Sequence, residues 1–307
     1  MSGKIRSLLI SMAMTLIFVC PAARAAEGKE YTFGFRMDSS AHAGQVKELM
    51  TRGASVLKRK YDLSMKLAVY NDDKTFLEML KKRQLDFIYA WNVDLNIFAV
   101  RKAGYTPIVG LSVFDNGGND ELCLYSRNES KIDRIEDLKD KKALICGVTI
   151  DYYSLRKLLG VNPADYFINL KTRKDMSSCL SMFYPLSLGE ADTAFVSSTT
   201  YKMYKINNPG AIKDIKATAC AKPKMGFFIL ASKNVPPEVI SKFKSIMESY
   251  HKEKEIKDVA PLIKMTKARM FPVTIEDYRG LFDLYAEAEK KGWDKEFERL
   301  LKAQGTE

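Results

Sequence analysis

The stretch Leu85–Trp91, which reads LDFIYAW, decides the fold. It follows KTFLEMLKKRQ, where apolar residues recur at helical spacing until Arg83 and Gln84 interrupt them. Phe87–Tyr89 is then a short apolar run of the kind found in buried parallel strands. A helix, a polar break and a buried strand in this order predict one half of an α/β unit.

The same arrangement returns about a hundred residues later, where SSCLSMFYPLSLGE leads into Ala191–Ser198, ADTAFVSS. Both copies begin their strand with an aspartate, Asp86 or Asp192, and end it with side chains that can bind a ligand. We interpret the two aspartates as structural, because a strand length separates them from the carboxyl end. Ligands of parallel α/β sheets bind at that end, so two such ends predict two lobes that face one cleft.

Alternating strands and amphipathic helices continue on both sides of these copies, which predicts an α/β protein with mainly parallel sheets flanked by helices. Two polar breaks, Asn116–Asp120 and Lys222–Lys224, are natural places for the chain to cross between lobes. We therefore expect lobe 1 to comprise residues 26–117 and 225–307, and lobe 2 residues 118–224.

The first 25 residues have the pattern of a secretory signal peptide. Lys4 and Arg6 precede the apolar run Leu8–Val19, and an Ala-Arg-Ala cleavage signal ends at Ala25. A run of twelve residues is too short for a permanent membrane anchor, so we expect cleavage and export to the periplasm. Without this segment the chain keeps 46 basic and 38 acidic residues, a net charge of +8 that either steers an anionic ligand or reflects a lysine-rich surface. No basic stripe with interleaved aromatic residues indicates nucleic-acid binding.

Four cysteines remain after cleavage: Cys123, Cys146, Cys179 and Cys220. None forms a CxxC pair, which argues against a zinc site, and we expect no metal and no cofactor. An even number of cysteines in an oxidising compartment permits two disulfides, while small buried thiols are the alternative. The sequence leaves the pairing open.

Several segments in a fixed order resemble a known family. The signal peptide, the opening YTFGFRMD, the pair LDFIY and GEADTAF, and IEDLKDKKALICG are similar to the type II periplasmic solute-binding proteins, in particular the phosphate, phosphite and phosphonate branch of ABC transporters. The resemblance implies two lobes, a hinge, ligand capture by closure, and an inner-membrane ABC permease as partner of a monomeric protein. The family's Ser-Thr-Ser-Gly loop is replaced here by GVTIDYYS at Gly147–Ser154, in which Asp151 would repel an anion.

The ends of the predicted strands supply the candidate ligand-binding residues. Those of the first lobe are Arg36, Asp38, Ser39, Tyr70, Tyr89, Trp91 and Asn92. Those of the second lobe are Thr149, Tyr152, Ser154, Arg173, Ser197, Ser198 and Thr199. Hydroxyls and a cation at helix N-termini suit a phosphate-like or phosphonate-like oxyanion, although capping of the helix or core packing would explain several of them equally well.

An organic cation is the alternative ligand. Tyr70, Tyr89, Trp91 and Tyr152 could surround it, with Asp38 or Asp151 balancing its charge. A second alternative is a sensory module that docks on a membrane receptor or histidine kinase. Catalysis is not expected, because the chain has two histidines and none of the GxSxG, HExxH or P-loop motifs.

Overall fold

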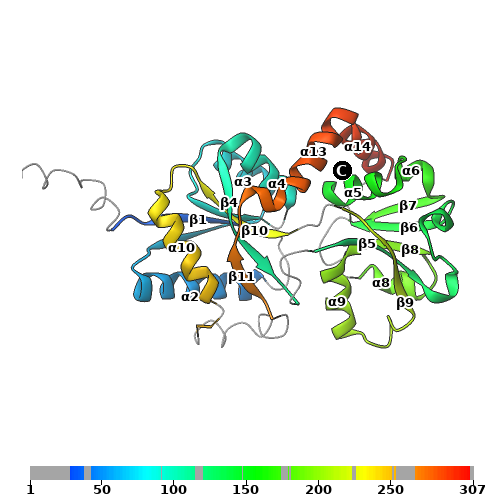
Figure 1. The fold of residues 1–307 in the computed structure, drawn as a ribbon, viewed down its shortest axis with the longest axis horizontal. Helices are drawn as coiled ribbons and strands as arrows, with labels where there is room; N and C mark the ends of the chain where they lie inside the picture. Colours follow the sequence, from blue (N-terminus) through cyan, green and yellow to red (C-terminus); the bar gives the residue numbers. More distant parts are fainter. Residues whose placement is uncertain are drawn as a thin grey trace, which may run out of the picture.

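The computed structural model describes residues 28–37, 43–90, 92–114, 120–146, 148–173, 179, 181–222, 226–250, 252–253 and 267–304. Two β-sheets lie side by side along the long axis of the molecule, each flanked by helices (Figure 1). The predicted two-lobed α/β fold is confirmed. Among the described residues, no helix has the length and apolar character needed to cross a membrane.

The first sheet, which defines the first lobe, has six strands in the order β11-β4-β10-β3-β1-β2. Its strands are β1 (Tyr31–Arg36), β2 (Met65–Tyr70), β3 (Phe87–Ala90), β4 (Tyr105–Ser112), β10 (Phe227–Ser232) and β11 (Arg269–Pro272). β1 pairs in parallel with both β2 and β3, whereas β10 is antiparallel to β3 and β4 and lies between them. β4 therefore runs in the same direction as β3 without touching it.

The second sheet, which defines the second lobe, has five strands in the order β7-β6-β8-β5-β9. Its strands are β5 (Leu122–Arg127), β6 (Lys142–Cys146), β7 (Asn169–Arg173), β8 (Thr193–Ser197) and β9 (Ile215–Cys220). β6 is parallel to β7 and β8, and β5 is antiparallel to β8 and β9. This arrangement repeats that of the first sheet, strand for strand, except that β11 has no counterpart.

Helices cover both faces of the first sheet because its strands are apolar on both sides. The helices are α2 (Ala43–Tyr61), α3 (Asp73–Lys81), α4 (Val93–Phe98), the π-helical turn η1 (Ala99–Ala103) and α10 (Pro237–Tyr250). Leu57 of α2 and Phe243 of α10 pack on Phe33 and Phe87. On the opposite face Phe76 and Leu80 of α3 are fully buried, and each such side chain contributes about 1.5–3 kcal/mol.

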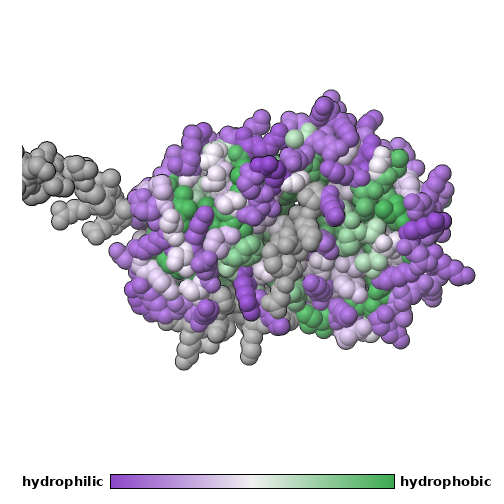
Figure 2. Space-filling model, viewed as in Figure 1, coloured by the Kyte–Doolittle hydropathy of each residue, from purple (hydrophilic) through white to green (hydrophobic). Residues whose placement is uncertain are grey.

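The second sheet is covered in the same way. Its helices are α5 (Thr149–Leu159), α6 (Pro163–Tyr166), α8 (Phe183–Ser187) and α9 (Ser198–Asn207), and short 3-10 turns lie at Asn128–Ser130 and Ile135–Leu138. Phe183 of α8 and Tyr201 of α9 pack on Tyr125 of the sheet. On the side shown in Figure 2 most of the surface is hydrophilic, and the apolar residues form several patches, one of them over β6 and β7 of the second lobe.

The C-terminal helices connect the two lobes. After the 3-10 turn η4 (Ile275–Tyr278), α13 (Arg279–Lys291) and α14 (Trp293–Ala303) run from the first sheet across to α5 (Figure 1). Tyr285 of α13 packs edge-on against Tyr153 of α5, with ring centroids 5.3 Å apart. Gln304 then accepts hydrogen bonds from the backbone N–H and the hydroxyl of Thr172 in β7, at 3.1 and 2.8 Å. The sequence prediction assigned α13 and α14 to lobe 1. The predicted residue ranges of the two lobes stay a prediction.

Two elements differ from the sequence prediction. Strand β11 was not predicted, because RMFP is short and ends in a proline. The sequence predicts a helix over Tyr152–Leu159, whereas α5 begins one turn earlier, at Thr149, and so includes Asp151 in its first turn. The sequence also predicts a helix over Ile256–Ile263, which lies outside the described residues.

Candidate functional site

The two lobes meet where the first turns of α4 and α5 come together. The hydroxyl of Thr149, the first residue of α5, donates a hydrogen bond of 2.6 Å to Oδ2 of Asp94 in α4. The hydroxyl of Tyr285 donates to the other oxygen of the same carboxylate. α4 and α5 each follow a strand, β3 and β6, so this contact lies at the carboxyl ends of both sheets, where ligands of α/β folds bind.

On the first lobe, an ion pair occupies the predicted site residues. Arg36, which ends β1 and is 8% exposed, donates from Nε to Oδ1 of Asp73 at 2.5 Å. Asn92 donates to the other oxygen of Asp73 at 2.9 Å, while its own Oδ1 caps α4 by accepting the backbone N–H of Asp94. The structure thus brings Arg36 and Asn92 together through Asp73, which partly neutralises the arginine.

The two predicted tyrosines of this lobe are largely in packed surroundings. Tyr89 is buried and stacks on Phe35, with ring centroids 5.2 Å apart, and burial raises the pKa of its hydroxyl. Tyr70 is half-buried and packs edge-on against Phe76 at 5.4 Å. Asp38, Ser39 and Trp91 lie outside the described residues. Their proposed contacts with a ligand stay predictions.

On the second lobe, residues Thr149–Ser154 of the predicted loop lie in α5, so their side chains point in different directions. Tyr152 is fully buried, stacks on Phe297 of α14 at 4.9 Å, and donates a hydrogen bond of 2.9 Å to Asn162. Tyr152 therefore faces the C-terminal helix, away from Thr149 and Asp94. Ser154 is also fully buried, and its hydroxyl has no partner within the described chain.

The predicted hydroxyl cluster at Ser197–Thr199 lies at the N-terminus of α9. Its polar groups already form hydrogen bonds within the chain. Ser197 caps the helix by accepting the N–H of Thr200 at 3.1 Å. Oδ1 of Asp120 accepts the hydroxyl of Ser198 at 2.8 Å and the N–H of Thr199 at 2.9 Å. A carboxylate of the chain itself thus fills the position in which an anion would bind this helix.

Arg173 ends β7, where its backbone pairs with Cys146, and the structure describes nothing of its side chain. Cys146 forms a disulfide with Cys179, and Cys123 forms a second with Cys220 of the neighbouring strand β9. Both bonds belong to the second lobe, and the first of them lies at the end of β6 directly before the candidate site. The structure therefore provides the pairing that the sequence left open.

Three functional candidates escaped the sequence reasoning: Asp94, Asp120 and Tyr285. Asp94 was hidden inside a predicted helix, and Asp120 inside a predicted break. Tyr285 comes from a helix 191 residues away from Asp94 in the sequence, so no local pattern indicated their contact. The only usable signal was an acidic residue two positions after the candidate Asn92.

Burial changes the acid–base properties of these groups. It raises the pKa of Asp151 well above its ordinary value, and the negative charges of Asp120 and Asp94 raise it further. Burial also raises the pKa of Asp94, while the hydrogen bonds from Thr149 and Tyr285 oppose the shift. The pKa of the Tyr285 hydroxyl is raised mainly by burial and then by Asp94. At this site the surroundings of Asp151 and Asp94 therefore favour the protonated carboxyl group over the charged carboxylate.

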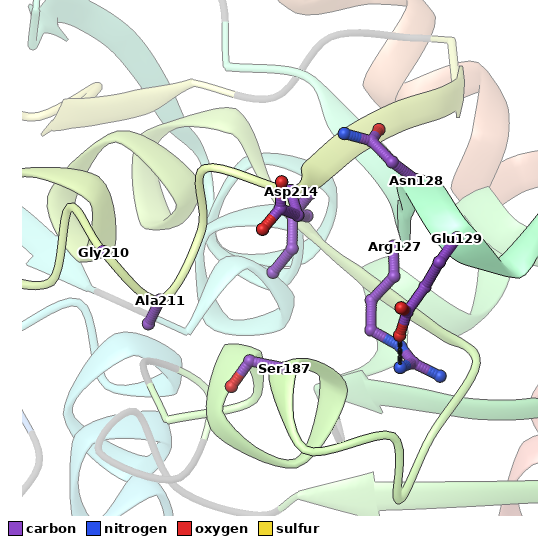
Figure 3. A pocket seen from close by; sticks show the side chains of 8 residues that line it. Arg127, Asn128, Glu129, Ser187, Gly210, Ala211 and Asp214 are labelled. Carbon is purple, nitrogen blue, oxygen red and sulfur yellow. Dashed lines mark hydrogen bonds and ion pairs between the residues drawn. The ribbon is translucent and has the colours of Figure 1, made fainter.

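A hollow lies at the end of the second sheet where β8 begins, opposite to the end that carries the α4–α5 contact (Figure 3). It has a volume of about 530 Å³, and Arg127, Glu129, Ser187 and Asp214 are among the residues that line it. Arg127 forms an ion pair with Glu129 within it. This hollow is open and is separated from the α4–α5 contact by the length of the strands. Glu121, Cys123 and Cys220 lie close enough together to hold a metal ion. The two cysteines form a disulfide, however, so neither offers a thiolate ligand.

Comparison with solved structures shows the same fold. A binding protein component of an ABC phosphonate transporter from Pseudomonas aeruginosa superposes with a TM-score of 0.59 at 15% identity, covering 90% of this chain and 98% of that chain. PhnD1 from Prochlorococcus marinus, in complex with methylphosphonate, gives 0.61 at 13% identity, with 85% and 99% covered. The periplasmic aliphatic sulphonate binding protein SsuA from Escherichia coli gives 0.55 at 13% identity, with 86% and 88% covered.

No curated protein sequence matches the chain. Residues 35–278 match the family described as the periplasmic substrate-binding protein of the phosphonate ABC transporter. This match spans both sheets and the α4–α5 contact, from the end of β1 to η4. The resemblance seen in the sequence is therefore confirmed, and the chain belongs to the family of periplasmic substrate-binding proteins of ABC phosphonate transporters.

Proposed function

We propose that this protein captures a small ligand between its lobes, at the contact of α4 and α5, and delivers it to the permease of an ABC transporter. The mature protein begins at Ala26 and acts as a monomer. The observation that carries the proposal is the hydrogen bond between Thr149 of the second lobe and Asp94 of the first, formed at the carboxyl ends of both sheets. A ligand held there would contact both lobes, as capture by closure requires.

We propose a phosphate-like or phosphonate-like oxyanion as the part of the ligand that binds α5. The backbone N–H groups of Thr149 and Ile150 have no acceptor among the described residues, and Val148 provides no side-chain cap. Free N–H groups in the first turn of a helix, together with its dipole, attract anions. The first turn of α9 is different, because Glu121, Asp120 and Ser197 accept its N–H groups. Methylphosphonate in the structurally similar protein from Prochlorococcus marinus supports this ligand class.

The test is a thermal-shift titration of residues 26–307 with phosphate, phosphite, methylphosphonate and ethylphosphonate. A ligand at 100 times its Kd stabilises the folded protein by about 2.7 kcal/mol and raises Tm. We expect at least one phosphonate to do so. If none of these anions raises Tm, the proposed oxyanion class is wrong.

Two variants of one residue locate the anion. Thr149→Val removes the hydroxyl and keeps the N–H, whereas Thr149→Pro removes both. Proline is tolerated at the first position of a helix, and Val148 already has the extended backbone that proline demands of its predecessor. We expect Thr149→Pro to weaken anion binding more than Thr149→Val. Equal binding by the two folded variants would place the anion elsewhere.

A sensory module would bind the same ligand, so binding alone does not separate it from a transport protein. Stimulation of ATP hydrolysis by the reconstituted permease does separate them. We expect stimulation that depends on the ligand and is lost with Thr149→Pro.

A further inference from the structure

The helices α13 and α14, together with Gln304, form a strap that reaches from one lobe to the other (Figure 1). Up to Tyr278 the chain belongs to the first lobe. There β11 pairs with β4, and the ring of Tyr278 packs on Phe228 of β10 with centroids 4.3 Å apart. Beyond Tyr278, α13 and α14 both pack on α5 of the second lobe. The strap therefore leaves the lobe in which it starts.

Aromatic side chains bind the strap to α5. Phe297 of α14 stacks on Tyr152, and Trp293 lies against Tyr153 with ring centroids 6.3 Å apart. Tyr285 of α13 contacts the same Tyr153 edge-on. All five rings are buried, and buried aromatic residues contribute strongly to the stability of such contacts. Among the described residues, every aromatic contact of the strap is with α5.

Ion pairs hold the same surfaces together. Arg156 of α5 donates from Nε to Glu296 of α14 at 3.1 Å, and its guanidinium lies 5.3 Å from the ring centre of Trp293. The side chains of Arg156 and Glu296 are 19% and 18% exposed, so salt screens their attraction only weakly. Lys157, the next residue of α5, pairs with Glu287 of α13 at 2.9 Å. Two successive residues of α5 thus hold one helix of the strap each.

The end of the strap is bound to the edge of the second sheet. β7 is the outermost strand there. The side-chain amide of Gln304 accepts the backbone N–H of Thr172 and donates to the carbonyl of Leu170. A residue of a neighbouring parallel strand would form the same pair of hydrogen bonds on either side of Lys171. Gln304 thus covers part of the open edge of β7, which would otherwise be available for pairing.

The contacts of the strap with the first lobe are of a different kind. Glu289 of α13 pairs with Arg101 of η1 at 2.7 Å, but these side chains are 63% and 33% exposed. Exposed ion pairs contribute little to stability. The other contact is the hydrogen bond from Tyr285 to Asp94 of α4. Both contacts are polar, and such contacts separate more readily than the packed rings on α5.

The junction between η4 and α13 is suited to bending. Tyr278 lies between the 3-10 turn and the α-helix, with φ −115° and ψ 11°, and so belongs to neither. Arg279 and Gly280 follow it and are exposed. Glycine leaves the backbone freer than any other residue, and hinges consist of a few residues at the ends of elements.

We propose that the strap moves with the second lobe about a hinge at Tyr278–Gly280, and that its contacts with Asp94 and Arg101 hold the lobes together. This inference rests on the proposed closure of the lobes but not on the identity of the ligand. It assigns α13 and α14 to the second lobe, whereas the sequence prediction assigned them to lobe 1. The strap is then a third connection between the lobes, which fastens them outside the candidate site through Arg101 and Glu289.

The test measures three distances between nitroxide labels on residues 26–307 by double electron–electron resonance. All four cysteines of this segment are disulfide-bonded, so introduced cysteines are the only free thiols. The label positions are exposed: Ser245→Cys in α10 marks the first lobe, Lys205→Cys in α9 the second lobe, and Lys295→Cys in α14 the strap. The protein is measured without ligand.

The variant Asp94→Ala/Arg101→Gln removes both of these contacts with the first lobe, and with them the acceptor of Thr149. We expect the distance between the lobes to lengthen and the distance from the strap to the first lobe to lengthen with it. The distance from the strap to the second lobe should stay the same. Arg101→Gln alone, at an exposed site that does not affect folding, should give a smaller shift in the same direction.

The matched control Lys157→Gln/Gln304→Ala removes polar contacts of the strap with the second lobe instead. It should leave all three distances unchanged, because the ring contacts on α5 remain.

The outcomes decide which lobe carries the strap. A longer distance from the strap to the second lobe, with an unchanged distance to the first lobe, overturns the inference. Three unchanged distances in both Arg101 variants would show that these contacts do not hold the lobes together, which also overturns it. Neither result bears on oxyanion capture, which the thermal-shift titration tests separately.

Discussion

The strands β3 and β8 occupy equivalent places in the two sheets, and they agree at one end and differ at the other. At the start of β3, Oδ2 of Asp86 accepts the N–H of Thr32 in β1 at 2.8 Å. At the start of β8, Oδ2 of Asp192 accepts the N–H of Lys142 in β6 at the same distance. The two aspartates thus connect equivalent pairs of neighbouring strands by a hydrogen bond, and their predicted structural role is confirmed.

The other ends of these strands face the candidate site and have different chemistry. β3 leads to Asn92, which shares Asp73 with the cation Arg36. β8 leads to Ser197 and Ser198, and the carboxylate bound there, Asp120, has no described cation beside it. The comparison shows that the same residue is kept where the sheet is held together, whereas the ends at the candidate site differ between the lobes.

The largest expected difference between the lobes comes from their covalent links. Both disulfides of the described chain lie in the second lobe, joining residues 97 and 33 positions apart. In the chain-entropy description, losing the longer link costs about 4–5 kcal/mol and the shorter about 3–4 kcal/mol. Urea unfolding of Cys123→Ser/Cys220→Ser and Cys146→Ser/Cys179→Ser checks this. Equal stability of the oxidised and reduced protein would show that the links contribute nothing.

The matched aspartates give the next largest effect. Asp86→Ala and Asp192→Ala each leave a backbone N–H at a strand start without its acceptor, which costs about 1–3 kcal/mol. We expect similar losses in the two lobes and unchanged ligand affinity, measured by urea unfolding and calorimetry. A loss in one lobe alone would show that the hydrogen bonds are not equivalent.

The sequence was informative where the structure is local and uninformative where it depends on distant contacts. Apolar alternation located β1 and β2, the repeated order of helix, polar break and apolar run located β3 and β8, and the polar residues Asp72 and Ser197 marked the starts of α3 and α9. It did not indicate that β10 inserts between β3 and β4, because pairing order depends on the whole sheet. In the site, Thr149 was found by its place after a strand. Its partner Asp94 was not found, because the two residues meet only when the lobes pack together.

The pH dependence of stability distinguishes the candidate site, where Asp151 lies, from the opposite ends of the strands. The pKa of Asp151 in the folded protein is raised by burial and then by Asp120 and Asp94, so this group favours folding while it is protonated. Its contribution is present below the ordinary pKa of an aspartate and is lost as the pH rises through the raised value. Asp151→Asn cannot ionise, so it should raise Tm near pH 7 and have little effect near pH 4. Tm measured from pH 4 to pH 8, with Asp165→Asn of an exposed residue in α6 as control, checks this.

A variant that melts below the wild-type protein at neutral pH would contradict that assignment. It would mean that the ionised carboxylate of Asp151 stabilises the ligand-free protein. Burial also raises the pKa of Asp94, whose charge acts on Asp151, so the double variant Asp94→Asn/Asp151→Asn should show a still flatter pH profile.

The smallest effect comes from two serines that are alike except for their position. Ser154 of α5 and Ser126 of β5 are both fully buried, and neither hydroxyl has a described partner. Ser126 pairs with Thr193 at the start of β8, at the edge of the sheet away from the candidate site. Replacing either serine by alanine removes an unsatisfied group, so stability should stay within about 1 kcal/mol or rise. If Ser154 contacts the ligand, as its place in the loop predicts, only Ser154→Ala weakens phosphonate binding. Equal affinities for both variants would assign Ser154 to the core, and would confine recognition on α5 to its first turn.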